Sequence, residues 1–317
     1  MEIAEILDNE LKQKTYQVQY LEYHINNFID YQYKDTTKEN YKHPLKKFNK
    51  YLLNSSIVEL REDNINQTVK QYRKYLDKGT DLKPSSINNY ITILRVFLHQ
   101  QLNLETNKIK KLNNDDDDIE AKYIPIEDVK GLVDTVQYIT GNEELIARDK
   151  AIICTLFGGG LRVSELMNIE KKDYINKNGI YYIYIHGKGT AKGNKKPIAI
   201  PKQTADHINK YLTERNKHNR NCKYLFCSYK DKQLTRQAVN KNIKKITKEY
   251  DLRNNKNINP RVSTHTFRHS LARYLLVDKG IPISQVKSIL RHSSIETTAK
   301  YLTNSQEEIQ QLRQNIF

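Results

Sequence analysis

The chain has 317 residues, of which 38% are hydrophobic, and its 53 Lys and Arg outnumber 37 Asp and Glu to give a net charge of +16. This length favours two domains, and the hydrophobic content excludes general disorder. The sequence has no run of about 18 apolar residues and no signal-peptide pattern at its start, so we expect neither a membrane span nor secretion. The basic excess favours a polyanionic partner such as nucleic acid, but an AT-rich coding sequence would also raise the lysine content.

Residues 17–112 are predicted to form a bundle of helices, preceded by an N-terminal segment at residues 1–16. Apolar residues recur here every three or four positions, as on one face of a helix. The predicted stripes are Tyr41, Leu45, Phe48 and Leu52, then Ile65, Val69, Tyr72 and Leu76, then Ile87, Tyr90, Ile91, Leu94 and Leu98. Lys and Arg lie on the outer faces, so this part is predicted to be a small helical domain with a basic surface.

Four consecutive aspartates lie in the segment NNDDDDIEAK, residues 113–122. Adjacent carboxylates repel one another and cannot enter a core, so the segment is predicted to be an exposed acidic linker. A metal site is the less favoured interpretation, because no fixed scaffold holds these carboxylates.

After the linker the pattern mixes helices and strands. ARDKAIICTLFGGG is helical and ends in three glycines, a strong stop signal. IYYIYIHGKG has the β-branched and aromatic residues of a strand, and the second apolar run KKPIAIP completes a hairpin with Lys188 near its turn. Further helices follow, so the predicted fold class is mainly α with a small β-sheet (α+β).

Several motifs for bound groups fail. Cys154, Cys222 and Cys227 are too few for a disulfide framework, and no second Cys or His pair at zinc-site spacing accompanies the last two. The glycine after Lys188 stands where a phosphate-binding P-loop needs Ser or Thr, and Thr266 stands where a zinc-protease helix needs Glu. We therefore expect no metal and no other cofactor.

The segment STHTFRHSLARY is predicted to be a helix that Ser263 or Thr264 caps. His265 and Arg268 lie one turn apart and can act on one anion near the helix N-terminus, where backbone N–H groups favour negative charge. Two solvated surface residues are the alternative interpretation of this pair taken alone.

Two other segments carry residues suited to the same chemistry. GLRVSEL places Arg162 directly after the glycines, with Glu165 three residues later. LRHSSIETTAKYL carries His292 and Tyr301, and the apolar stripe predicted for this piece leaves Tyr301 off the packing face. An ordinary surface residue is the alternative, because the chain has 22 tyrosines.

Together, GLRVSEL, the GKG hairpin, HTFRH and LRHSSIETTAKYL resemble in order and spacing the signature of the tyrosine recombinases, the phage integrase family. The resemblance covers nearly the whole chain. It implies a helical core-binding domain and a catalytic domain, residues 123–304, that form a C-shaped clamp around DNA. The implied site consists of Arg162 and Arg268 as the arginine pair, Lys188 as the hairpin lysine, His265 and His292 as the histidines, Tyr301 as the nucleophile and Glu165 as support for the first arginine.

The resemblance implies a site-specific recombinase that cuts and rejoins DNA strands through a 3′-phosphotyrosyl intermediate, for integration, excision or resolution of a DNA element. Two guanidiniums can neutralise the phosphate, a lysine can protonate the leaving 5′ oxygen and a histidine can act as general base, so neither metal nor ATP is needed. A type IB topoisomerase and a non-catalytic DNA-binding regulator are the alternatives.

The implied partners are double-stranded DNA with inverted-repeat core sites, a homotetramer on two duplexes, and an accessory DNA-bending or directionality protein. The expected location is the cytoplasm, at the nucleoid. The short N-terminal segment favours an Xer-like or transposon-encoded two-domain layout over the lambda type. Residues 305–317 are predicted to form an amphipathic helix. We expect it to dock on a neighbouring protomer, and docking on its own catalytic domain is the alternative.

Two positions depart from the family pattern. Arg291 stands where the family usually has Gly before the second histidine, and Gly159 where it usually has Thr or Ser. If the first position needs a positive φ, arginine costs about 1 kcal/mol of strain there; otherwise the helix ends differently.

Overall fold

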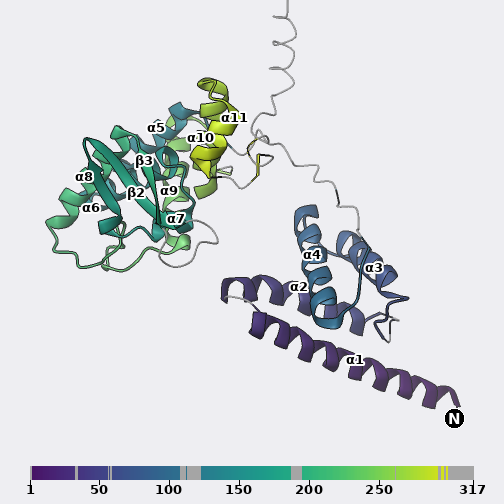
Figure 1. Cartoon of the computed structure of the whole chain (residues 1–317). Coiled ribbons are helices and arrows are strands. Elements are labelled where there is room, and N and C mark those ends of the chain that lie inside the picture. Colours follow the sequence, from purple (N-terminus) through teal and green to yellow (C-terminus); the bar gives the residue numbers. More distant parts are fainter. Residues whose placement is uncertain are drawn as a thin grey trace, which may run out of the picture. The chain divides into compact units, whose positions relative to one another are not determined.

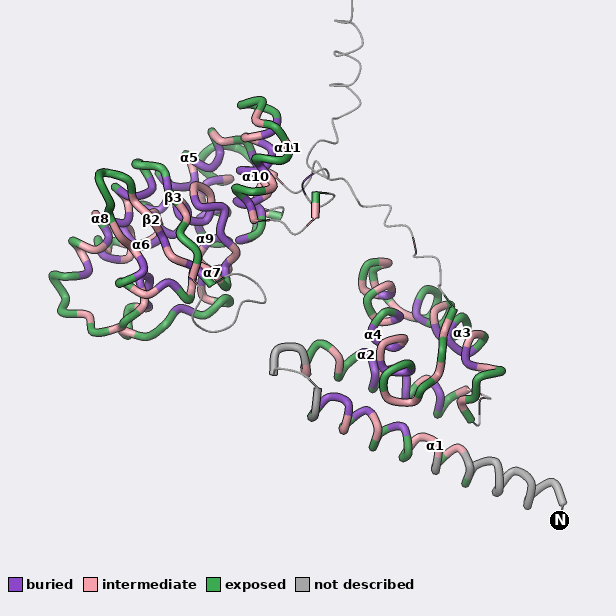
Figure 2. Tube along the Cα trace, viewed as in Figure 1, coloured by how far each residue is buried: buried purple, intermediate pink, exposed green. Residues whose placement is uncertain are grey.

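The structure is a computed structural model that describes residues 2–32, 35–55, 57, 59–107, 112, 123–186, 195–260, 262–291, 294–295 and 298. The chain divides into two compact units, Met1–Asp117 and Asp118–Phe317 (Figure 1). The division falls inside the acidic segment 113–122. Each unit has a separate buried core (Figure 2). No helix in the described ranges is both long and apolar enough to cross a membrane.

The N-terminal unit is helical, as its periodicity predicts. Its helices are α1 (Glu2–Gln32), α2 (Asp35–Leu53), α3 (Ile65–Lys78) and α4 (Pro84–Leu102). The predicted stripes meet in one core, in which Leu45, Phe48, Val69 and Leu98 are completely buried.

Helix α1 crosses the expected boundary between the N-terminal segment, residues 1–16, and the helical domain that begins at residue 17. The helix begins at Glu2 and continues without a break to Gln32. The physical reason is local, because Glu, Leu, Lys and Gln fill this stretch and are among the strong helix formers.

Aromatic rings hold much of the N-terminal core. The ring centroids of Phe28 and Phe97 lie 5.3 Å apart, and those of Phe48 and Tyr72 lie 4.9 Å apart, both edge to face. Such pairs contribute about 0.5–1.5 kcal/mol each beyond their burial. The Tyr72 hydroxyl is buried without a hydrogen-bond partner among the described residues, and burial raises the pKa of Tyr72.

The C-terminal unit combines helices with one small sheet. In chain order its elements are α5 (Ile126–Thr135), η2 (Val136–Tyr138), α6 (Glu143–Gly158), α7 (Val163–Met167), η3 (Lys171–Asp173), β1 (Tyr174–Lys177), β2 (Ile180–His186), β3 (Lys195–Ile200), α8 (Lys202–Asn216), α9 (Arg236–Asn254), α10 (Thr264–Arg273), the π-helical turn η4 (Tyr274–Asp278) and α11 (Ile283–Leu290). The α+β prediction is confirmed.

The sheet contains the predicted hairpin and one strand more. Its order is β1-β2-β3, all antiparallel, with Tyr182 opposite Ala199 in the hairpin. In β1, Tyr174 lies opposite Ile183. The sequence pattern missed β1 because YINK is too short to show an alternation of apolar and polar residues.

Charged residues are buried in the C-terminal unit. The side chain of Arg215 is completely enclosed, and its guanidinium donates to the carbonyl oxygens of Cys222 (2.5 Å), Tyr224 (2.7 Å) and Leu225 (2.9 Å). A second buried cation, Arg148, pairs with Asp149 at 2.7 Å. These cations fix loops and helix ends that apolar side chains could not hold, because backbone carbonyls need donors.

Candidate functional site

Helix α10 carries two of the predicted site residues. The helix begins after Ser263, whose amide N–H donates to Oγ1 of Thr266 at 2.9 Å. Phe267 is completely buried in the core of the unit. This packing fixes the rotation of the helix, and with it the directions of His265 and Arg268.

Arg268 ties three helices together. Only 3% of the residue is exposed. Its Nη1 donates to the carbonyl oxygen of Gly160 at 2.5 Å, directly after α6, and its Nη2 donates to the carbonyl oxygen of Leu290, at the end of α11. Helix C-termini carry partial negative charge, so both contacts stabilise the buried guanidinium.

Arg162 and Glu165 form the second part of the site, at the start of α7. The backbone N–H of Arg162 donates to Oε2 of Glu165, and its Nη1 donates to Oε1, both at 2.8 Å. The Glu165 side chain is 7% exposed and that of Arg162 is 29% exposed. The carboxylate is therefore built into the protein, while the guanidinium that it orients remains accessible to a ligand.

The turn before Arg162 favours glycine. Gly160 has a φ of +54°, and a Cβ there would lie 2.9 Å from Leu271 and 3.0 Å from Leu290. The chain thereby turns from the end of α6 into α7 with the Gly160 carbonyl within reach of Arg268. The three glycines that predict a helix end thus also bring the two arginines to one place.

His265 lies one helical turn before Arg268 on α10, and the charges of both arginines act on it. Its pKa lies below the ordinary value, first because neighbouring protein atoms desolvate it and then because of the charges of Arg236, Arg268 and Arg162, against the opposite influence of Glu165. His265 is nevertheless exposed to solvent. A neutral imidazole near two guanidiniums can accept a proton from a nucleophile.

Arg236 and Arg291 were not identified from the sequence as members of this neighbourhood. Arg236 begins α9 and lowers the pKa of His265 through its charge. No motif signals its role, because its position depends on the tertiary fold. For Arg291 the sequence did contain a signal, because this arginine replaces the glycine that the family usually has at its position.

Arg291 has the positive φ that the family's glycine suggests. It ends α11 with φ +58° and ψ +43°, which costs an L-residue about 1–2 kcal/mol. Its guanidinium donates to the carbonyl oxygens of Ile289 (3.1 Å), Gly159 (3.4 Å) and Gly160 (3.1 Å) and to Oε2 of Glu165 (3.2 Å). Burial lowers the pKa of the Arg291 guanidinium, and Glu165 opposes this shift.

Three predicted site residues lie outside the described part of the chain. The connection between β2 and β3, residues 187–194, contains Lys188, and His292 and Tyr301 follow α11. The predicted C-terminal helix at 305–317 and the linker at 113–122 also lie outside it. Among the predicted residues, the structure therefore brings together Arg162, Glu165, His265 and Arg268.

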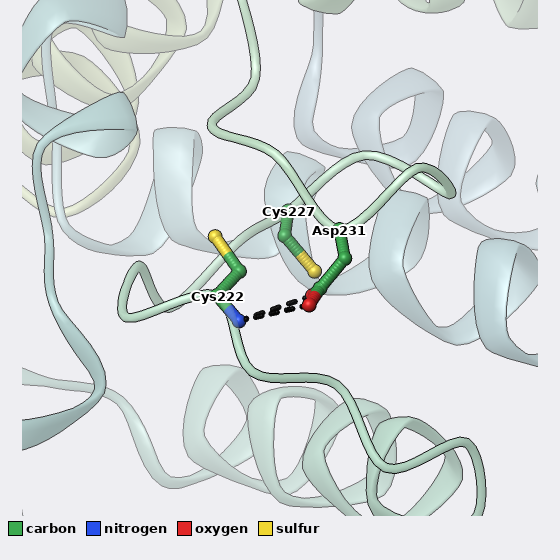
Figure 3. Close-up of side chains that lie close together, drawn as sticks. All are labelled: Cys222, Cys227 and Asp231. Carbon is green, nitrogen blue, oxygen red and sulfur yellow. Dashed lines mark hydrogen bonds between the residues drawn. The ribbon is translucent and has the colours of Figure 1, made fainter.

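One cluster has residues that could ligate a metal. Ligand atoms of Cys222, Cys227 and Asp231 lie within 4.8 Å of one another (Figure 3). The Asp231 carboxylate, however, accepts from the backbone N–H of Asn221 at 2.8 Å and of Cys222 at 3.1 Å. Burial raises the pKa of the Cys227 thiol, which opposes the thiolate that a metal needs. These hydrogen bonds indicate that Asp231 stabilises the backbone at Asn221 and Cys222 rather than binding a cation.

A profile of the phage integrase family matches residues 122–308. The chain is 30% identical over 258 residues to the tyrosine recombinase XerA of Thermococcus kodakarensis. The aligned region covers 74% of this chain and 83% of that protein. It is also 30% identical over 292 residues to the tyrosine recombinase XerD of Staphylococcus haemolyticus, covering 86% of this chain and 89% of that one.

Solved structures share the fold at lower identity. The Tn1549 transposon integrase in complex with transposon right-end DNA has a TM-score of 0.66 at 15% identity, covering 96% of this chain and 98% of that chain. The XerH recombinase bound to its difH substrate has a TM-score of 0.65 at 20% identity, covering 88% and 80%. The relatives do not favour a topoisomerase or a non-catalytic regulator. The chain belongs to the phage integrase family, the tyrosine recombinases, and is a site-specific recombinase that cleaves and rejoins DNA.

Proposed function

We propose that Tyr301 attacks a DNA backbone phosphate in line and forms a 3′-phosphotyrosyl bond, while the bond to the 5′ oxygen breaks. Arg162 and Arg268 bind the non-bridging oxygens, on which negative charge gathers in the transition state. His265 accepts the proton of the Tyr301 hydroxyl, and Lys188 donates a proton to the leaving 5′ oxygen.

His292 donates a hydrogen bond to a phosphate oxygen, and Glu165 orients Arg162. Attack by the freed 5′-hydroxyl of another strand reverses the step, so the energy of the phosphodiester is kept and no ATP is consumed. The observation that carries this proposal is the convergence of Arg162, His265 and Arg268 at the end of α6.

We propose further that the substrate is double-stranded DNA with inverted-repeat core sites, bound by the helical domain 17–112 and the catalytic domain 123–304. Four protomers hold two duplexes, and residues 305–317 pass to a neighbouring protomer in a ring. The net charge of +16 supports a DNA partner, because phosphate neutralisation releases counterions. The protein acts in the cytoplasm at the nucleoid, and an accessory DNA-bending protein can direct the outcome.

The test is Tyr301→Phe on a nicked duplex that carries a site selected by the protein from a random DNA pool. We expect DNA binding to stay within a few-fold, and the covalent adduct on a denaturing gel to disappear, because only the attacking hydroxyl is lost. The matched control is Tyr229→Phe, since Tyr229 is 57% exposed and packs on Arg220. An adduct that persists in Tyr301→Phe would overturn the assignment of the nucleophile.

A further inference from the structure

Arg291 occupies a position that is unfavourable for an arginine. Its backbone has φ +58°, and Nε is buried without a hydrogen-bond partner among the described residues. A glycine would avoid both the strained backbone and the unmet donor. Strain of this kind persists where surrounding contacts impose it, and it is common at functional sites.

The Arg291 guanidinium shares its acceptors with the proposed arginine pair. Oε2 of Glu165 accepts from the backbone N–H of Arg162 at 2.8 Å and from Nη2 of Arg291 at 3.2 Å. The carbonyl oxygen of Gly160 accepts from Nη1 of Arg268 at 2.5 Å and from Nη2 of Arg291 at 3.1 Å. One side chain therefore touches both groups that hold Arg162 and Arg268.

The charge of Arg291 also affects the pair. The Glu165 carboxylate that orients Arg162 offsets part of the positive charge which that arginine presents to a phosphate. Arg162, Arg268 and Glu165 together carry one net positive charge, and Arg291 raises the total to two. A phosphodiester transition state gathers negative charge on its oxygens, so the second charge favours it over the ground state.

We propose that Arg291 is a positioning residue for cleavage: it clamps Glu165 and the Gly160 carbonyl, and so holds Arg162 and Arg268 in the geometry that binds the scissile phosphate. The inference rests on the proposed role of these two arginines. Arg291 itself need not touch DNA, because it acts through the acceptors that it shares with them.

The experiment compares Arg291→Gly and Arg291→Lys with the unaltered chain, using single-turnover adduct formation on the nicked duplex. For Arg291→Gly we expect the cleavage rate at saturating protein to fall by about tenfold to a hundredfold, the effect of slightly misplaced groups. DNA binding should stay within a few-fold, and the Tm should stay equal or rise. Arg291→Lys keeps the positive charge but lacks the two Nη groups of the guanidinium, so its cleavage rate should lie between those of the unaltered chain and Arg291→Gly.

The matched control is Asn255→Gly, because Asn255 ends α9 with φ +49°. This substitution also replaces a residue of positive φ by glycine, but at the end of another helix. Its cleavage rate should be unchanged. We also expect Arg162→Ala combined with Arg291→Gly to lose less activity than the product of the two single losses, since both act through Glu165.

A wild-type cleavage rate for Arg291→Gly would overturn the inference, as would a fall in rate matched by falls in Tm and in DNA binding. Strictly multiplicative losses in the double variant would contradict action through a shared partner. Failure of the underlying mechanism looks different: Arg162→Ala alone would then cleave at the normal rate.

Discussion

Both units have an apolar core, but they differ in the polar groups buried with it. In the N-terminal unit, apolar and aromatic side chains such as Phe48 and Phe97 fill the core. In the C-terminal unit, buried guanidiniums such as Arg215 and Arg268 bind backbone carbonyls at loops and helix ends. Apolar packing suffices for the helical N-terminal unit, whereas the C-terminal unit also buries cations whose positions are fixed by backbone carbonyls.

The largest effect should come from Arg268→Met, which keeps the size of the side chain and removes its donors. The Leu290 carbonyl would lose its Arg268 donor, and an unsatisfied buried acceptor costs about 1–3 kcal/mol, whereas the Gly160 carbonyl would keep Arg291 as a donor. We therefore expect a lower Tm, together with a loss of about a hundredfold to a thousandfold in adduct formation, as when one transition-state donor is removed.

Arg162→Met is the matched variant for this comparison. Arg162 is more exposed and bonds to Glu165, which Arg291 continues to hold. We expect a similar loss of adduct formation in single-turnover assays with little change in the Tm. An equal decrease of the Tm in the two variants would contradict the distinction between Arg268, which stabilises the fold, and Arg162, which serves ligand binding alone.

A smaller and opposite effect should follow removal of a buried polar atom from the N-terminal core. Tyr72→Phe deletes a hydroxyl that has no hydrogen-bond partner among the described residues, so we expect a gain of about 1 kcal/mol. Hydrogen exchange of the α3 amides, read by mass spectrometry, measures the change in that unit alone. Tyr75→Phe, in which the altered side chain is 42% exposed, should leave α3 unchanged. Faster exchange in Tyr72→Phe would show that the hydroxyl contributes to stability.

The smallest effect concerns pH, to which the C-terminal unit should respond. Desolvation and the charges of Arg236 and the arginine pair lower the pKa of His265, so the ring stays neutral and able to act as a base below its ordinary pKa of about 6.5. We expect the acidic limb of the cleavage profile below that pH. The folded state also binds this proton more weakly than the unfolded chain, so stability falls as pH drops from about 6.5 through the folded pKa.

Arg236→Gln sharpens this prediction. Loss of the Arg236 charge should raise the pKa of His265 and move the acidic limb upward by a fraction of a pH unit. The measurement is the pH profile of adduct formation at subsaturating protein. Lys248→Gln removes an equal charge from an exposed position on α9 and should leave the limb in place. Identical shifts in both variants would mean that general DNA attraction, not His265, sets the profile.

Much of the fold follows from sequence periodicity, and the N-terminal unit most clearly. The apolar residues Ile65, Val69, Tyr72 and Leu76 recur every three or four positions, and this spacing predicts α3. All four are buried in the structure. The pairing of β2 with β3 was also predictable, since β-branched and aromatic runs flank a glycine-rich sequence. Local patterns of this kind are set by neighbours in the chain and are therefore visible in it.

The candidate site was predictable only in part. Residue types in the family's order indicated Arg162, His265 and Arg268, and the structure places them together. The contacts of Arg291 with Glu165 and Gly160 were not predictable, because they join positions more than 120 residues apart. The carbonyls of Gly160 and Leu290, which accept from Arg268, were not predictable either, although they lie only 108 and 22 residues away from it. Such contacts depend on how helices pack, and no periodicity encodes them.

Gly160 has a consequence for how this enzyme can change under selection. Its carbonyl receives two guanidiniums, and both its φ of +54° and the adjacent Leu271 and Leu290 side chains disfavour a side chain there. A substitution there would displace two arginines in one step, whereas a substitution at either arginine leaves the other in place. Directed evolution toward new DNA sites should therefore explore the exposed basic surface of the helices, and libraries that vary residue 160 should yield few active clones.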